Sequence, residues 1–99
     1  MKRRSRGAIL STVFLALLAP RFSAAEFYFG DLHAHSGLSD DATGSPEGFF
    51  LTARDVARLD FVALSDHDVF LTPNEWEILK ATAASFDQPG EFVAFSAIE

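Results

Sequence analysis

The chain of 99 residues contains no cysteine, which excludes both a disulfide scaffold and a structural zinc site with cysteine ligands. Basic residues are also few. The 8 lysines and arginines are outnumbered by 14 acidic residues, so a basic nucleic-acid-binding protein is excluded. Because 48% of the residues are hydrophobic, the composition is not that of a disordered chain. The sequence therefore describes at most one small, acidic, globular domain.

The first 25 residues have the pattern of a secretory signal peptide. Four basic residues come first: Lys2, Arg3, Arg4 and Arg6. An apolar stretch follows at 8–19, and small residues at 23–25 then suit a signal peptidase. At about twelve residues, the apolar stretch is shorter than the roughly 20 that span a bilayer, although a short uncleaved anchor is the alternative. We expect residues 1–25 to be removed on export, and the rest to act in the periplasm or outside the cell.

Removal of the signal peptide would leave a strongly acidic domain at residues 26–99. This part holds all 14 acidic residues but only three basic ones, Arg54, Arg58 and Lys80. Such a charge distribution repels nucleic acids and anionic membranes at long range, and it attracts cations. We therefore expect no nucleic-acid partner and no stable membrane insertion after cleavage.

Strand and helix patterns alternate along this domain. Apolar runs at 27–32, 61–65 and 91–99 predict three strands, the last two of them buried. Pro46 and Pro73 each fit the first turn of a helix between two strands. Helices between strands require right-handed parallel crossovers, so the predicted fold class is α/β.

Each predicted helix has one apolar face. Ser45 is a candidate N-cap of the first helix, and the face consists of Phe49, Ala53, Val56 and Ala57. Thr72 and Glu75 have the spacing of a capping box at the start of the second helix, whose face consists of Trp76, Leu79, Ala83 and Phe86. We expect these faces to form the core, together with the phenylalanines that follow residue 26.

Three parallel strands make an incomplete fold. They can neither form a doubly wound sheet nor close into a barrel. A core of this size without disulfides contributes only about 3–5 kcal/mol. The last predicted strand also reaches Glu99 without a closing turn or a covering helix. We therefore expect the chain to be the N-terminal part of a longer protein, continuing for about 150 residues or more as in a complete barrel.

The pair His33 and His35 has the spacing of metal ligands. Side chains alternate along a strand, so the two imidazoles are expected on the same side, within reach of one cation. Asp31 precedes them by two residues and is a candidate carboxylate for the second nitrogen of an imidazole. An isolated pair of this kind is more often a surface or hydrogen-bonded pair than a metal site.

The pattern becomes more selective when the whole chain is considered. His67 follows the second predicted strand, Glu99 ends the third, and the predicted helices contain no histidine. Asp40 and Asp41 follow His35 in a loop and can add an oxygen ligand. In a parallel β/α barrel the carboxyl ends of the strands share one rim, so these residues are expected to meet around metal ions.

These motifs resemble the N-terminal part of the PHP (polymerase and histidinol phosphatase) metallohydrolases. The matching segments are GDLHAHS at 30–36, SDD at 39–41, LDFVALSDH at 59–67 and the strand that ends in Glu99. Within that family the chain is most similar to the exported branch of little-known function that is related to carbaryl hydrolases. The resemblance covers essentially all of residues 26–99.

The resemblance implies a distorted seven-stranded β/α barrel, of which this chain would supply the first three βα-type units. It also implies two or three divalent ions, zinc, manganese or iron, at the carboxyl rim. By the same resemblance His33 and His35 would bind one metal, His67 and a loop aspartate a further metal, and Glu99 would bridge them.

The resemblance also assigns roles to Asp40, Asp41 and Asp66, and the chain departs from the family pattern in two places that matter here. The loop aspartate can be Asp40 or Asp41, and the Asp41–Ala42 pair favours Asp41. Asp66 would lie in the second shell or serve as an occasional ligand. Arg58 stands where the family commonly has a helix-ending glycine, so either a left-handed residue there costs about 1–2 kcal/mol or the helix ends differently. The family's later histidine and aspartate ligands lie beyond Glu99.

The expected activity is metal-dependent hydrolysis of a small-molecule ester by a metal-activated hydroxide. No serine, cysteine or lysine with a partner base indicates a covalent intermediate. A phosphoester is favoured by the resemblance, and a carboxyl or carbamate ester is an alternative. A truncated, non-catalytic, exported metal-binding fragment is the main competing interpretation. Amidohydrolases also place two histidines after their first strand, but the run Ser65–Asp66–His67 argues against them.

Overall fold

The computed structural model describes residues 25–99, so nearly all of the predicted signal peptide lies outside the described residues. Among residues 25–99, no helix is both long enough and apolar enough to cross a membrane. The elements in order are β1 (Gly30–Ala34), α2 (Pro46–Leu51), the π-helical turn η1 (Thr52–Val56), β2 (Phe61–Asp66), the 3-10 turn η2 (Asp68–Phe70), α3 (Pro73–Phe86) and β3 (Val93–Ile98).

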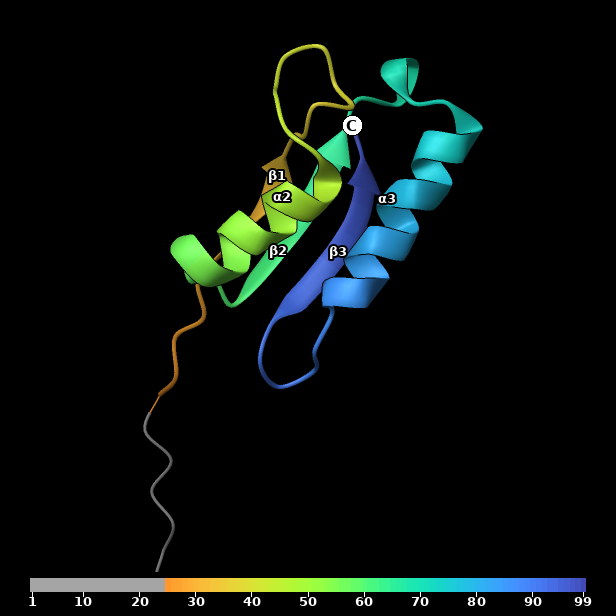
Figure 1. The fold of residues 1–99 in the computed structure, drawn as a ribbon. Helices are drawn as coiled ribbons and strands as arrows, with labels where there is room; N and C mark the ends of the chain where they lie inside the picture. Colours follow the sequence, from red (N-terminus) through yellow and green to blue (C-terminus); the bar gives the residue numbers. More distant parts are fainter. Residues whose placement is uncertain (1–24) are drawn as a thin grey trace, which may run out of the picture.

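The three strands form one parallel sheet in the order β1-β2-β3, with β2 in the centre (Figure 1). Both helices pack on one face of this sheet, and their apolar residues join those of β2 in a single core. The phenyl rings of Phe50 in α2 and Phe86 in α3 stack with their centroids 5.5 Å apart. The predicted α/β class is confirmed.

Gly30 sets the close approach of β1 to β2. A β-carbon at this position would collide with the backbone oxygen and the ring of Phe61, its register partner. Only glycine permits such a close approach of two backbones. At the same end of the sheet, the backbone N–H of Phe29 donates to Oδ2 of Asp60 over 2.8 Å, which holds the entry to β1.

The first helix begins as predicted but ends differently. The Ser45 hydroxyl accepts a hydrogen bond from the N–H of Gly48 over 3.1 Å. After Leu51 the chain continues as a π-helical turn, in which the N–H of Ala57 donates to the carbonyl of Thr52. The wider turn rotates the positions that follow. As a result Val56 is 76% exposed, and Ala57 is exposed as well, so neither lies in the predicted apolar face. Phe50, which the prediction left out of this face, is fully buried.

The second helix agrees with its prediction. The Thr72 hydroxyl accepts from the N–H of Glu75, and the Glu75 carboxylate accepts in return from the N–H of Thr72, which completes the capping box. Buried residues of the predicted stripe are Leu79, Ala83 and Phe86, with Trp76 packed beside them. The helix therefore has its apolar face against the sheet and against α2.

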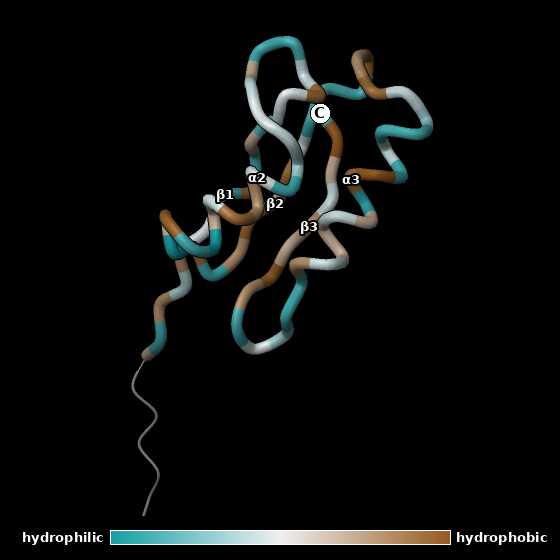
Figure 2. Tube along the Cα trace, in the orientation of Figure 1, coloured by the Kyte–Doolittle hydropathy of each residue, from teal (hydrophilic) through white to brown (hydrophobic). Residues whose placement is uncertain are grey.

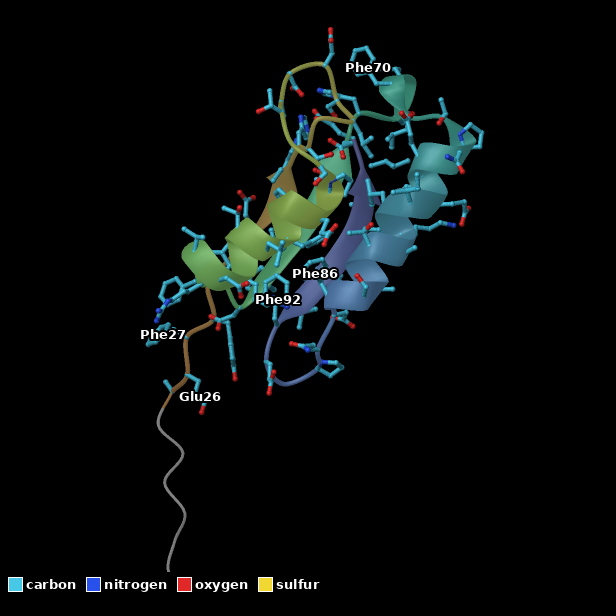
Figure 3. The ribbon with its side chains drawn as sticks, viewed as in Figure 1. Glu26, Phe27, Phe70, Phe86 and Phe92 are labelled. Carbon is cyan, nitrogen blue, oxygen red and sulfur yellow. The ribbon has the colours of Figure 1, made fainter. Side chains whose placement is uncertain are left out.

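The expectation that β3 is buried was wrong. Phe95 is 46% exposed and Ile98 is 55% exposed, because β3 is an edge strand and only one face of the sheet carries helices. The expectation that all the phenylalanines lie in the core was wrong as well. Figure 3 shows Phe86 and Phe92 inside the molecule, whereas Phe27 and Phe70 point away from it at opposite ends.

The loops at the two ends of the sheet are mainly hydrophilic, as the colouring of Figure 2 shows. One turn, at 87–91, joins α3 to β3. The other loop, at 36–44, joins β1 to α2 at the carboxyl end of the strands. Its N–H at Gly37 donates to the carbonyl of Gly44 over 2.6 Å, so the loop is closed at its base.

Candidate metal centre

A β-bulge in β1 decides which way its side chains face. Asp31 pairs with Val62, but Ala34 pairs with Leu64, so β1 has one residue more than β2 between these pairs. Val62 and Leu64 belong to the core beneath the helices. Because side chains alternate along a strand, Asp31 and Ala34 share the helix side, and His33 and His35 lie on the uncovered side of the sheet.

Alternation along the strand keeps His33 and His35 on one side, as predicted, but the bulge separates Asp31 from them. The Asp31 carboxylate accepts a hydrogen bond from the backbone N–H of His33 over 2.9 Å. It contacts neither imidazole within the part of the chain that the structure describes. Without the extra residue, strict alternation would place Asp31, His33 and His35 on one face. The structure therefore does not bring Asp31 into the site.

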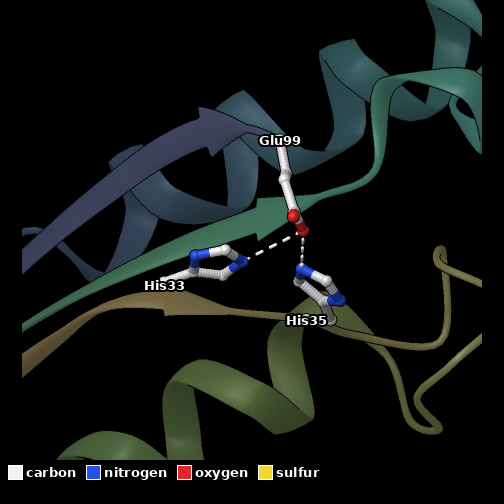
Figure 4. Close-up of side chains that lie close together, drawn as sticks. All are labelled: His33, His35 and Glu99. Atoms are coloured by element: carbon white, nitrogen blue, oxygen red, sulfur yellow. Dashed lines mark hydrogen bonds and ion pairs between the residues drawn. The ribbon is translucent and has the colours of Figure 1, made fainter.

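The first group of candidate ligands consists of His33, His35 and Glu99 (Figure 4). Oε2 of Glu99 lies 3.0 Å from Nε2 of His33 and 2.8 Å from Nε2 of His35. Glu99 follows the end of β3, where its N–H donates to the carbonyl of Asp66 over 3.2 Å. Two strand ends thus converge on one carboxylate oxygen.

His35 provides the clearest sign that this group fits a cation. Its side chain is only 13% exposed, and its buried Nε2 lies 2.8 Å from Oε2 of Glu99 without the alignment of a hydrogen bond to any residue in 25–99. A buried polar atom without a hydrogen bond is costly. When Nδ1 carries the proton that bonds to Asp41, Nε2 turns a lone pair toward the Glu99 carboxylate, and a cation between the two would bind both. A divalent ion at this place would satisfy both atoms.

The second group consists of His35, Asp41 and His67. The Asp41 carboxylate oxygens lie 2.9 and 3.0 Å from Nδ1 of His35, and one of them lies 3.2 Å from Nε2 of His67. Nδ1 of His67 is also 3.3 Å from Oε2 of Glu99. The two groups therefore share His35 and lie side by side at one end of the sheet.

The charges of the site are coupled. Hydrogen bonding to Asp41 is the main cause that raises the pKa of His35, against the opposing effect of burial. The same contact lowers the pKa of Asp41, and the hydrogen bond with His33 is the main cause that lowers the pKa of Glu99. Both carboxylates are thus held in their charged form, which is the form that binds a metal.

The two remaining candidate acids, Asp40 and Asp66, lie outside both groups. Asp40 is exposed in the loop, so of the two adjacent aspartates only Asp41 meets the histidines. Asp66 is fully buried. Its carboxylate accepts three hydrogen bonds: from the N–H and the hydroxyl of Ser36, at 2.7 Å each, and from the hydroxyl of Ser39 at 2.8 Å.

Ser36 and Ser39 were missed by sequence reasoning. Both are buried, and Ser39 also accepts a hydrogen bond from the backbone N–H of His67 over 2.9 Å. Serines are common in loops, so their type alone points to no role. The usable signal was their position, because each lies within or beside the motifs that contain His35 and Asp41.

The donor set indicates which ions these groups can hold. Three imidazoles and two carboxylates are suited to zinc, manganese or iron, whereas calcium and magnesium prefer sites made of oxygen alone. The ligand atoms of each group lie within 4.8 Å of one another, which is close enough for one ion. These clusters can therefore bind a divalent metal ion.

No protein-family model matches the chain, and no curated protein or solved structure does either.

Proposed function

We propose that this chain belongs to a PHP-type, metal-dependent hydrolase that cleaves a small-molecule ester, with a phosphoester as the favoured substrate class. One observation carries the proposal: three imidazoles and two carboxylates from three strand ends meet at one rim, and the buried Nε2 of His35 has no hydrogen bond among residues 25–99. Carboxyl ends of parallel strands are the usual place for catalytic groups in β/α folds.

In this proposal His33, His35 and Glu99 hold one ion, and Asp41 and His67 hold a further one beside it. Divalent ions in such a site supply a Lewis acid and lower the pKa of water to the range where it is a nucleophile at neutral pH. The protein's own part is to keep Asp41 and Glu99 ionised and to aim the imidazole nitrogens at the ions. Asp41 also orients the ring of His35 through Nδ1.

The proposed complete fold is a distorted seven-stranded β/α barrel. Support comes from the order of the strands, which follows the sequence, and from the helices, which all lie on one side of the sheet. Successive βα units in a barrel have this arrangement, with the opposite face of the sheet turned inward. Exposed apolar residues on β3, such as Phe95, are consistent with such burial.

The substrate class rests on the family resemblance, whereas the metal chemistry rests on the site. Phosphoesters follow from the resemblance to the PHP family. The basic residues of the described part all lie away from the carboxyl ends of the strands: Arg54 in η1, Arg58 in the turn between η1 and β2, and Lys80 in α3. Metal ions would therefore have to bind the phosphate. A carboxyl or carbamate ester of similar size is therefore the second choice. Export to the periplasm or the exterior remains part of the proposal.

A non-catalytic metal-binding module is the second candidate function. It is favoured by the open position of the site, because the side chain of His33 is 62% exposed and that of Glu99 is 42% exposed. Enzymes commonly enclose their substrates and exclude water. A module that only binds an ion needs no such enclosure.

Hydrolysis assays separate the two candidates. The full chain, loaded with Zn²⁺ or Mn²⁺, is tested on a generic aryl phosphodiester and on an aryl carboxyl ester. We expect turnover of the phosphodiester that falls by at least about 100-fold in His33→Ala and His67→Ala, since each removes a ligand. Asp40→Asn is the control and should leave turnover unchanged. Bound metal without turnover supports the module, and turnover that is indifferent to both histidines contradicts the proposal.

A further inference from the structure

A buried carboxylate outside both ligand groups connects all three strand ends. Asp66 is the last residue of β2 and is fully buried, yet it has no basic partner among residues 25–99. Its donors are all neutral and all come from the loop that follows His35. A buried carboxylate costs free energy unless it is fully hydrogen-bonded, so its presence here calls for a role.

The hydrogen bonds of Asp66 lead to both ligand groups. Through Ser36 it holds the residue next to His35, and through Ser39 it reaches the backbone N–H of His67. Its own carbonyl accepts from the N–H of Glu99. One side chain and one carbonyl therefore tie the loop and β3 to the end of β2.

The loop that Asp66 holds also carries Asp41. The hydrogen bond from Gly37 to Gly44 closes this loop, and the N–H of Ser39 donates to the carbonyl of Ser36 over 3.1 Å. Because the loop is closed and internally bonded, its anchor at Ser36 and Ser39 sets where Asp41 lies. Asp41 is itself 54% exposed, and its side-chain partners among residues 25–99 are the two histidines His35 and His67.

We propose that Asp66, with Ser36 and Ser39, is a positioning network that holds Asp41 and His67 at metal-binding distance from His35 before any ion arrives. We call this the Asp66 network. The inference rests on the proposed function, because it assigns the network to the same metal centre. It gives Asp66 a role through its neighbours and not as a ligand.

The network is expected to matter more for one group of ligands than for the other. Ser39 belongs to the loop that carries Asp41, and its hydroxyl bonds to Asp66 and to the N–H of His67. Asp41 and His67 are both ligands of the second group, which also includes His35. The first group is held by β1 and by the backbone of Glu99, which Ser39 does not touch. Loss of the Ser39 hydroxyl should therefore weaken the second group selectively.

The test measures Zn²⁺ binding to the full chain by calorimetry in two backgrounds. Glu99→Gln disables the first group, and Asp41→Asn disables the second. We expect Ser39→Ala to raise the dissociation constant by about 10–100-fold in the Glu99→Gln background, the usual effect of losing an outer hydrogen-bond partner. In the Asp41→Asn background the change should stay below about threefold. An equal loss in both backgrounds, or no loss in either, would overturn the proposal.

Two further variants separate positioning from general destabilisation and from direct ligation. Ser45→Ala deletes a hydroxyl of the same kind at the far end of the loop, where it caps α2, and should leave Zn²⁺ affinity unchanged. Asp66→Asn keeps Oδ1 as the acceptor for the N–H of Ser36 and the hydroxyl of Ser39, and its amide can donate to the hydroxyl of Ser36. Zn²⁺ affinity should therefore fall by less than about tenfold. A loss of about 100-fold in Asp66→Asn would instead identify a metal ligand and contradict the positioning role.

The exchange rate of the Ser36 amide proton tests the Asp66 network without any metal, and so independently of the proposed function. If the parent chain binds no Zn²⁺, the proposed function fails, and the network is then judged from the metal-free protein. In Ser39→Ala the amide of Ser36 retains its own acceptor on Asp66, yet it should exchange about tenfold faster if the loop is held as a unit. Unchanged protection of this amide would refute the network.

Discussion

At the scale of single residues, His35 links the two groups of candidate ligands. Its Nε2 faces Glu99 and its Nδ1 faces Asp41, so each nitrogen of one ring points to a different carboxylate. A carboxylate on one imidazole nitrogen fixes the ring and makes the other nitrogen a better ligand. The contact with Asp41 is therefore as much a part of the site as the contact with Glu99.

The two adjacent aspartates of the loop allow a matched comparison. Asp41→Asn removes a charge that contacts both His35 and His67, so Zn²⁺ affinity should fall by about 10–100-fold. Asp40→Asn removes the same charge one residue earlier, outside both groups, and should change affinity by less than about twofold. Calorimetric titration of both variants measures the difference. Equal effects would show that only the net charge of the loop matters.

Metal binding should weaken as the pH falls. An imidazole binds a metal only when it is neutral, and the contact with Asp41 raises the pKa of His35 above its ordinary 6.5. Protons therefore begin to displace Zn²⁺ at a higher pH than for an isolated histidine. In Asp41→Asn the main cause of the raised pKa is absent, so the fall in affinity should begin at a lower pH. Titrations across the range from about pH 8 to about pH 5 test this; an onset that does not move contradicts it.

At the scale of elements, the end of the first helix is strained. Arg58 has a φ of 54°, in the left-handed region that favours glycine, while the N–H of Leu59 closes the turn on the carbonyl of Ala53. The sequence left two outcomes open at this position, where the resembling family commonly has glycine: a left-handed residue or a different helix end. The structure shows the left-handed residue, Arg58.

Relief of this strain should stabilise the domain. Arg58→Gly should raise the free energy of unfolding by about 1 kcal/mol. Glycine removes the cost of the left-handed conformation, but part of this gain is lost because glycine makes the unfolded chain more flexible. Arg58→Ala keeps the β-carbon and should give no such gain, although it loses the same charge. Urea unfolding of the three proteins measures the effect. If alanine stabilises as much as glycine, the cause is the charge and not the backbone.

Several elements could be predicted from the sequence because their signals are local. The capping box of α3, the N-cap at Ser45 and the apolar run of β2 each depend on residues within one turn or one strand. The grouping of the histidines at one rim followed from the parallel arrangement, which those elements implied. Each of these predictions agrees with the structure.

What the sequence could not reveal depends on contacts between elements. Asp31 was expected beside the histidines, but the bulge that turns it away is visible only in the pairing of β1 with β2. The exposure of β3 could not be predicted either, because a buried strand and an uncovered edge strand have the same apolar pattern. Likewise, nothing in the type of Ser39 indicates that its hydroxyl joins Asp66 to His67.

At the scale of the whole molecule, the site concentrates charge in a small fold. Glu99 and Asp41 are held ionised near one another at the end of a three-stranded sheet, in a chain with 14 acidic residues and few basic ones. Within residues 25–99, one face of that sheet has no helix, and the outer edges of β1 and β3 have no strand partner. A bound cation would relieve repulsion between the carboxylates and join the ends of all three strands.

Zn²⁺ should therefore stabilise the folded chain. At a free concentration about 100 times the dissociation constant, a ligand that binds only the folded state adds about 2.7 kcal/mol. Ca²⁺ is the control, because it prefers six to eight oxygen ligands and should add little. Unfolding in urea, with and without each ion, measures the gain. His35→Ala should abolish the effect of Zn²⁺, and a gain that persists in this variant would place the ion elsewhere.

The central claim is that side chains from three strand ends bind the same metal centre. The chain has three histidines, so nuclear magnetic resonance can follow every imidazole during addition of Zn²⁺. We predict that the nitrogen signals of His33, His35 and His67 all change, and that Asp40→Asn leaves these changes intact. If Zn²⁺ changes none of them, or changes His33 without His35, the claim is contradicted.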